Sequence, residues 1–187
     1  MNNEPVDYDK QLLKQIADGD RHALTDLYGR FKRPLFSYLL QLTPDYGLAE
    51  ELLQDTLVAI WKSAHSFEGR SSVSTWIFSI ARRQAHNTLR RSKLPLANEI
   101  EMDELVSTHP EPEEFTLAFV ARDELVETFN QLAPVYREVL VLTFIQEFSY
   151  QETANILEVP VGTVKSRLSN ARRLLRTILD ARERTKR

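Results

Sequence analysis

Cysteine is the most informative absence from this chain of 187 residues, which contains none. Its absence excludes disulfide frameworks, thiolate metal sites and cysteine nucleophiles. Only five glycines are present, and apolar residues recur every three or four positions, which predicts helices rather than strands. The longest nearly apolar run, Val139 to Ile145, is far too short to cross a bilayer. The first residues have neither the basic start nor the apolar stretch of a secretory signal. We therefore expect a cytoplasmic protein without membrane insertion.

Sequence motifs for catalysis are also missing. The chain has no GxxxxGK, HExxH or GxSxG pattern, and its four histidines are scattered without the spacing of metal ligands. We expect no catalytic residue, no metal site and no cofactor, and hence a protein that is not an enzyme.

The net charge of -3 conceals a strong sorting of charge along the chain. Residues 70–93 hold six Lys or Arg and no acid, whereas residues 94–116 hold seven Asp or Glu and no Lys or Arg. Residues 161–187 hold nine basic residues against two acidic ones. Two basic surfaces joined by an acidic tether would suit a polyanion such as DNA, but solvated helix faces would give the same counts.

The periodicity divides the chain into two helical parts. In residues 8–93, Asp20 can cap a long helix that Pro34 should bend or interrupt, and two further helices follow. Residues 94–116 are acidic, contain three prolines and lack a period, which indicates a flexible linker. Residues 117–180 begin with a helix from Leu117 to Phe129, and Pro134 opens the next one. We predict an all-α fold of two small helical domains joined by a flexible acidic linker.

The second domain carries the most specific local pattern, a helix-turn-helix. Ser149 and Glu152 form a capping box before a short helix, and a turn then leads into a long basic helix. Apolar residues fall on one side of that helix and polar residues on the other. Such a helix enters the DNA major groove, where Asn170 could pair with adenine, although an ordinary surface helix would share the pattern. The candidate DNA contacts are Lys165, Ser166, Arg167, Ser169, Asn170 and Arg173.

The expected helix over residues 73–91 follows the same logic. One of its faces is basic and the loop before it is rich in serine, a combination suited to single-stranded DNA. Trp76 lies in the apolar stripe, which favours a core position over a stacking platform. The candidate contacts are Arg70, Ser71, Ser72 and Ser74 in the loop and Arg83, Asn87, Arg90 and Arg91 on the helix.

The expected helix over residues 49–62 has an acidic outer face that would repel DNA. It presents Glu51, Gln54, Asp55 and an exposed Val58. This face is either a docking surface for a protein or simply solvated.

These segments together resemble the extracytoplasmic-function sigma factors. The resemblance rests on residues 49–57 (AEELLQDTL), 74–82 (STWIFSIAR), 136–140 (YREVL), 149–154 (SYQETA) and 160–168 (PVGTVKSRL). It covers nearly the whole chain, in the order and spacing of the family's second and fourth conserved regions.

The resemblance implies a sigma factor that binds core RNA polymerase, reads minus-thirty-five and minus-ten promoter elements and is controlled by an anti-sigma factor. Residues 8–93 would be region 2, and residues 117–180 would be region 4. The basic helix of the second domain would read the minus-thirty-five element, and the serine loop with its helix the minus-ten element. The acidic face would contact the β′ clamp helices of core polymerase, whose β flap is a further expected partner.

Four residues depart from the family's common pattern. Arg83 stands where many relatives have Asn, and Ser169-Asn170 where they have His-Arg, so the promoter sequence is open. Glu158 replaces a frequent turn glycine, which predicts a turn without positive φ. Two other functions remain open: a helix-turn-helix regulator that works without polymerase, and a sigma mimic that titrates an anti-sigma factor.

Overall fold

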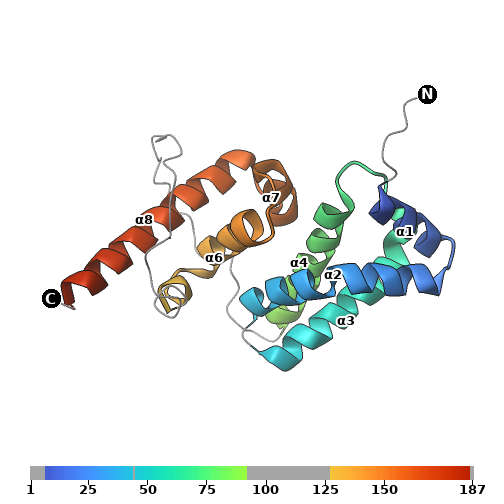
Figure 1. Ribbon diagram of the computed structural model, residues 1–187, viewed down its shortest axis with the longest axis horizontal. Coiled ribbons are helices and arrows are strands. Elements are labelled where there is room, and N and C mark those ends of the chain that lie inside the picture. The colour runs from blue at the N-terminus through green and yellow to red at the C-terminus, as the bar shows by residue number, and fades with distance from the viewer. Residues whose placement is uncertain (1–6, 44, 92–126, 186–187) are drawn as a thin grey trace.

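The computed structural model in Figure 1 describes residues 7–43, 45–91 and 127–185, and these ranges contain helices but no strand. The all-α prediction is therefore confirmed. The expected linker and most of the helix predicted from Leu117 lie outside the described residues. In chain order the elements are α1 (Tyr8–Ala17), α2 (Arg21–Leu42), α3 (Tyr46–Ser63), η1 (Ala64–Ser66), α4 (Val73–Arg91), α6 (Pro134–Leu140), η2 (Val141–Ile145), α7 (Tyr150–Leu157) and α8 (Val161–Thr185).

Helices α1 to α4 form the first part of the molecule. The Asp20 carboxylate caps α2 by accepting hydrogen bonds from the backbone N–H groups of His22 and Ala23, as predicted. Helix α2 runs through Pro34 without interruption. The expectation that Pro34 could interrupt this helix is therefore wrong. Leu35 and Leu39 on the following turn are fully buried, and their packing offsets the backbone hydrogen bond that proline cannot make.

The second part contains the helix-turn-helix, formed by α7 and α8. Pro134 is the first residue of α6, and both hydrogen bonds of the Ser149–Glu152 capping box are present. The predicted inner stripe of α8 faces the core. Ile178, its last member, is half-buried, and the other four residues are buried: Val164, Leu168, Ala171 and Leu175.

The turn between α7 and α8 contradicts the prediction that no residue in it needs positive φ. Glu158 has φ 54° and ψ 42°, in the left-handed region. The backbone N–H groups of Glu158 and Val159 both turn back to the carbonyl of Ala154, which closes the end of α7. This closure requires a left-handed residue whichever side chain is present.

Glycine at position 158 should consequently fit this turn better than alanine. We expect Glu158→Gly to be about 1 kcal/mol more stable than Glu158→Ala, because only glycine adopts this conformation without a steric cost. Both variants lose the same carboxylate, so their difference isolates the backbone effect. Urea unfolding followed by circular dichroism measures it, and equal stabilities would contradict this explanation of the turn.

The two parts pack against each other and share one hydrophobic core. Helix α7 contacts α4, and α6 contacts α2, so the four helices lie together at the middle of Figure 1. The rings of Phe78 on α4 and Phe148 before α7 meet edge to face with centroids 4.9 Å apart. The side-chain amide of Gln146 donates to the carbonyl of Pro34. The described helices of the two parts thus pack together around a shared core.

Candidate nucleic-acid interface

The outer face of α8 presents most of the residues predicted to contact DNA. Lys165 and Arg173 are exposed, while Ser169 and Asn170 are half-buried between them. The Ser166 hydroxyl donates to the carbonyl of Thr163, and the Arg173 guanidinium donates to Asn170 Oδ1 at 3.2 Å. Asn170 must therefore release Arg173 before it can pair with a base through both amide atoms.

Arg167 differs from the other candidates on α8 because it is half-buried. Its Nη1 is buried and has no hydrogen-bond partner within the described ranges. Burial lowers the pKa of Arg167, and the nearby charge of Glu138 on α6 opposes that shift. The side chain thus lies toward α6, and a contact with DNA stays a prediction.

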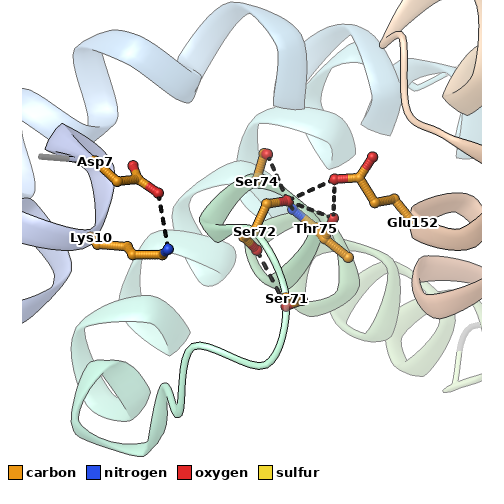
Figure 2. Close-up of polar contacts among 7 residues, drawn as sticks. All are labelled: Asp7, Lys10, Ser71, Ser72, Ser74, Thr75 and Glu152. Carbon is orange, nitrogen blue, oxygen red and sulfur yellow. Dashed lines mark hydrogen bonds and ion pairs between the residues drawn. The ribbon is translucent and has the colours of Figure 1, made fainter. Parts of the chain in front are cut away.

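The serine loop and the start of α4 form a compact polar cluster (Figure 2). Ser72 caps the helix, because its Oγ accepts from the backbone N–H of Thr75 at 3.2 Å and lies 3.2 Å from Ser74 Oγ. Ser71 donates to the carbonyl of Ser72. The Arg70 side chain is 83% exposed and pairs with Glu68. Hydroxyls and a cation at a helix N-terminus suit an anion such as a backbone phosphate.

A carboxylate from the other half of the molecule already occupies this cluster. Glu152 Oε1, on α7, accepts from Ser72 Oγ at 2.9 Å and from Thr75 Oγ1 at 3.1 Å (Figure 2). Its Oε2 accepts from the backbone and hydroxyl of Ser149. Burial alone would raise the pKa of Glu152, but the hydrogen bonds from Ser149, Ser72 and Thr75 outweigh it and lower that pKa. The Glu152 carboxylate is therefore ionised at neutral pH. Figure 2 also draws the separate ion pair between Lys10 and Asp7 of the first part.

Part of the basic side of α4 also contacts acidic residues of the second part of the molecule. Arg90 and Arg91 are exposed and Asn87 is half-buried. Arg83 pairs with Glu158 of the helix-turn-helix at 3.1 Å. Arg82, which the charge count included, is only 6% exposed and faces the second half of the molecule. Fewer cations are therefore available to contact DNA than the charge count over residues 70–93 suggests.

Arg82 belongs to a buried polar cluster that sequence reasoning missed. Glu138 is 1% exposed, and its Oε1 accepts from Arg82 Nε at 3.0 Å and from the Tyr38 hydroxyl at 2.8 Å. Burial and the Glu138 charge together raise the pKa of Tyr38 well above its usual value. Glu138 lies among Val135, Val139 and Leu142 at helical spacing, which was the one available signal that it faces inward.

The acidic face of α3 is assembled as expected. Glu51, Gln54 and Asp55 are exposed, and Val58 beside them is 49% exposed. Trp76, by contrast, is half-buried and packs against Phe67, with ring centroids 5.4 Å apart, so it lies at the margin of the core.

The described ranges contain no candidate metal site and no candidate membrane span. No group of three or more His, Asp or Glu side chains there could hold a metal ion. No helix in these ranges is both long and apolar enough to span a membrane.

The fold and these surfaces define a two-part helical protein with a helix-turn-helix in its second part. Residues 27–94 match the family model for Sigma-70 region 2, and residues 122–175 match the model for Sigma-70 region 4. The chain is 32% identical to the RNA polymerase sigma factor YlaC of Bacillus subtilis, over 81% of this chain and 89% of that protein. It is 26% identical to the ECF RNA polymerase sigma factor SigW of the same organism, over 89% of this chain and 94% of SigW.

Among solved structures, the chain is similar to the sigma factor RpoE of Bartonella quintana, determined in complex with the anti-sigma factor NepR. The TM-score is 0.59 at 28% identity, and the match covers 83% of this chain and 97% of RpoE. The chain belongs to the extracytoplasmic-function sigma factors of RNA polymerase. As a family, sigma factors are not enzymes.

Proposed function

We propose that this sigma factor binds core RNA polymerase in the cytoplasm and directs promoter-specific initiation with two DNA-reading surfaces. Residues 8–93 act as region 2, residues 94–116 as the linker and residues 117–180 as region 4. The observation that carries the proposal is the presence on one chain of an exposed polar face on α8, a serine loop before α4 and a separate acidic face on α3.

Helix α8 reads the minus-thirty-five element as double-stranded DNA. Lys165 and Arg173 contact phosphates, and Ser166, Ser169 and Asn170 reach base edges in the major groove. Arg167 joins them once it is freed from the neighbourhood of Glu138. This role is supported by the buried inner stripe of α8, which fixes the polar face outward.

The serine loop and α4 receive the minus-ten element as unpaired DNA. Loop hydroxyls and Arg70 hold the strand at the start of α4, and Arg83, Asn87, Arg90 and Arg91 neutralise its backbone. The hydroxyl cluster around Ser72 supports this role, because it already binds an anionic oxygen.

The remaining partners are proteins. The acidic face of α3 docks on the β′ clamp helices through Glu51, Gln54, Asp55 and Val58, and region 4 contacts the β flap. The complex of RpoE with NepR supports an anti-sigma factor as a further partner of this chain.

Run-off transcription tests the proposal directly. Purified protein and core polymerase are incubated with fragmented genomic DNA, and the RNA 5′ ends are mapped. We expect new starts with shared upstream elements near minus thirty-five and minus ten. Core binding without any new start would contradict promoter reading, and a specific gel shift that core does not alter would favour a regulator that works without polymerase.

Arg173 should contribute to minus-thirty-five binding through a phosphate. We expect Arg173→Ala to lower affinity for duplex promoter DNA about tenfold and to reduce the slope of log K against log salt by about one. Arg184→Ala removes the same charge from the far end of α8 and should change both values little. Fluorescence anisotropy over a salt series measures both the affinity and the slope. Identical binding curves for the two variants would show that DNA does not contact α8 at Arg173.

A further inference from the structure

We propose that Arg173 orients the side-chain amide of Asn170 so that its NH2 group faces the DNA, and that Asn170 therefore selects guanine rather than adenine in the minus-thirty-five element. The proposal rests on the proposed function, in which the outer face of α8 reads that element as double-stranded DNA. It makes Arg173 a positioning residue for base choice, in addition to its contact with a phosphate.

The two side chains meet on the outer face of α8. The Arg173 guanidinium donates from Nη2 to Asn170 Oδ1 at 3.2 Å. The residues are three positions apart, which is a spacing that brings side chains together on one helix face. Arg173 is exposed and Asn170 is half-buried. Because Ala171 and Leu175 on the same two turns are buried in the core, this part of α8 is anchored from its inner side.

The chemistry of arginine determines which end of the amide it contacts. A guanidinium carries N–H donors and no acceptor, whereas an asparagine amide has an accepting oxygen at one end and a donating NH2 group at the other. Exchanging the oxygen and nitrogen of Asn170 would place donor against donor beside a positive charge. The contact is therefore favourable in one orientation only, which leaves Asn170 Nδ2 as the atom that faces a base.

A donor at this position discriminates between the four bases in the major groove. Guanine presents two acceptors there, N7 and O6, whereas cytosine presents only the N4 donor. Adenine presents N7 beside its N6 donor, so asparagine pairs with it through both amide atoms. Thymine presents O4 next to a methyl group. Because Arg173 already bonds to the oxygen of Asn170, guanine is the base that best satisfies the remaining NH2 group.

Arg173 can bond to Asn170 and to a DNA phosphate at the same time. Its Nη2 donates to Asn170, and the guanidinium has further N–H groups that point in other directions of its plane. The side chain is exposed, so a phosphate can reach these groups. A phosphate contact would fix the guanidinium in register with the duplex. Backbone binding and base choice are therefore linked through one side chain.

The test measures base preference in duplex DNA. The natural full chain selects binders from a library of duplexes with a randomised central segment, and Asn170→Ala is put through the same selection. The position at which Asn170→Ala loses its preference is the base pair that Asn170 contacts. Fluorescence anisotropy then gives the affinity for duplexes that carry each base at that position. We expect the natural chain to bind guanine about tenfold more tightly than adenine there.

A modified base tests whether the contact lies in the major groove. Hypoxanthine keeps N7 and O6 but lacks the amino group that guanine presents in the minor groove. We expect hypoxanthine to bind within about twofold of guanine, because both atoms that Asn170 reads are retained. A loss of binding as large as that caused by adenine would contradict a major-groove contact through Asn170.

Arg173→Ala separates orientation of the amide from loss of charge. Without the guanidinium, Asn170 Oδ1 is free to accept from adenine N6, so we expect the preference for guanine over adenine to disappear or reverse. Lys165→Ala is the matched control, because it removes an exposed cation that we also assign to a phosphate, while the bond between Arg173 and Asn170 is retained. It should weaken binding to all sequences and leave the preference unchanged.

Asn170→Asp inverts the reading group at nearly constant shape. The change replaces the donating NH2 group by an accepting oxygen, and a carboxylate accepts from cytosine N4. Arg173 still bonds to one carboxylate oxygen and leaves the other toward the groove. We expect the preferred base at the same position to change from guanine to cytosine. A variant that still prefers guanine would contradict a contact through Asn170 Nδ2.

The outcomes distinguish this proposal from the proposed function. A guanine preference that is lost in Arg173→Ala and kept in Lys165→Ala supports the positioning role. A natural chain that prefers adenine, or a guanine preference that survives in Arg173→Ala, overturns it. A natural chain that selects no duplex sequence contradicts promoter reading by α8 as well. A selected sequence with the same preferences in Asn170→Ala overturns the role of Asn170 alone.

Discussion

Replacing Asp55 with arginine is expected to abolish binding to core RNA polymerase while the fold persists. Asp55 is exposed on α3 between Glu51 and Val58, in the face that we assign to the clamp helices. Like charges placed opposite each other at an interface cost several kcal/mol, so we expect affinity to fall at least about a hundredfold. Anisotropy of labelled protein titrated with core polymerase measures the change.

Asp26→Arg supplies the matched control for that charge reversal. Asp26 is exposed on α2 and lies outside the assigned face, so the variant carries the same change in net charge. We expect its affinity for core to change less than about twofold to threefold. Equal losses in the two variants would show a general electrostatic effect, and normal affinity in Asp55→Arg would remove the docking role from this face of α3.

The features that followed from the sequence are those that local rules determine. The caps at Asp20 and Ser149 need only a side-chain oxygen near backbone N–H groups two or three residues on. The inner stripe of α8 follows from helical geometry alone. These rules were enough to predict an all-α chain with a helix-turn-helix and to gather Glu51, Gln54 and Asp55 on one exposed face.

Local rules could not predict contacts between segments that are far apart in the sequence. Arg82 and Glu138 are 56 positions apart, and nothing local indicates that a cation in a basic helix is buried against an acid on another helix. Charge counting therefore included Arg82 in the basic stretch of residues 70–93, although Arg82 was not among the candidate DNA contacts. The conformation of Glu158 was missed for a related reason, because closure of α7 imposes positive φ and the residue type does not reveal it.

The same buried pair gives the largest expected change in stability. Removing one partner of a buried ion pair costs about 3–5 kcal/mol, and we expect Glu138→Ala to destabilise the protein by that amount. Tyr38→Phe removes only the hydroxyl that donates to the same carboxylate oxygen and should cost about 1.5–3 kcal/mol. Urea unfolding of the full chain measures both losses.

Replacing both charged partners should reverse the effect. In Arg82→Leu with Glu138→Leu, both charges of this buried pair are removed together, and we expect stability within about 1 kcal/mol of the natural chain or above it. A double variant as unstable as Glu138→Ala would show that the pair itself holds the two halves together. A double variant at least as stable as the natural chain would show instead that apolar packing alone can hold α4 and α6 together at this position, because neither leucine has to give up hydration when it is buried.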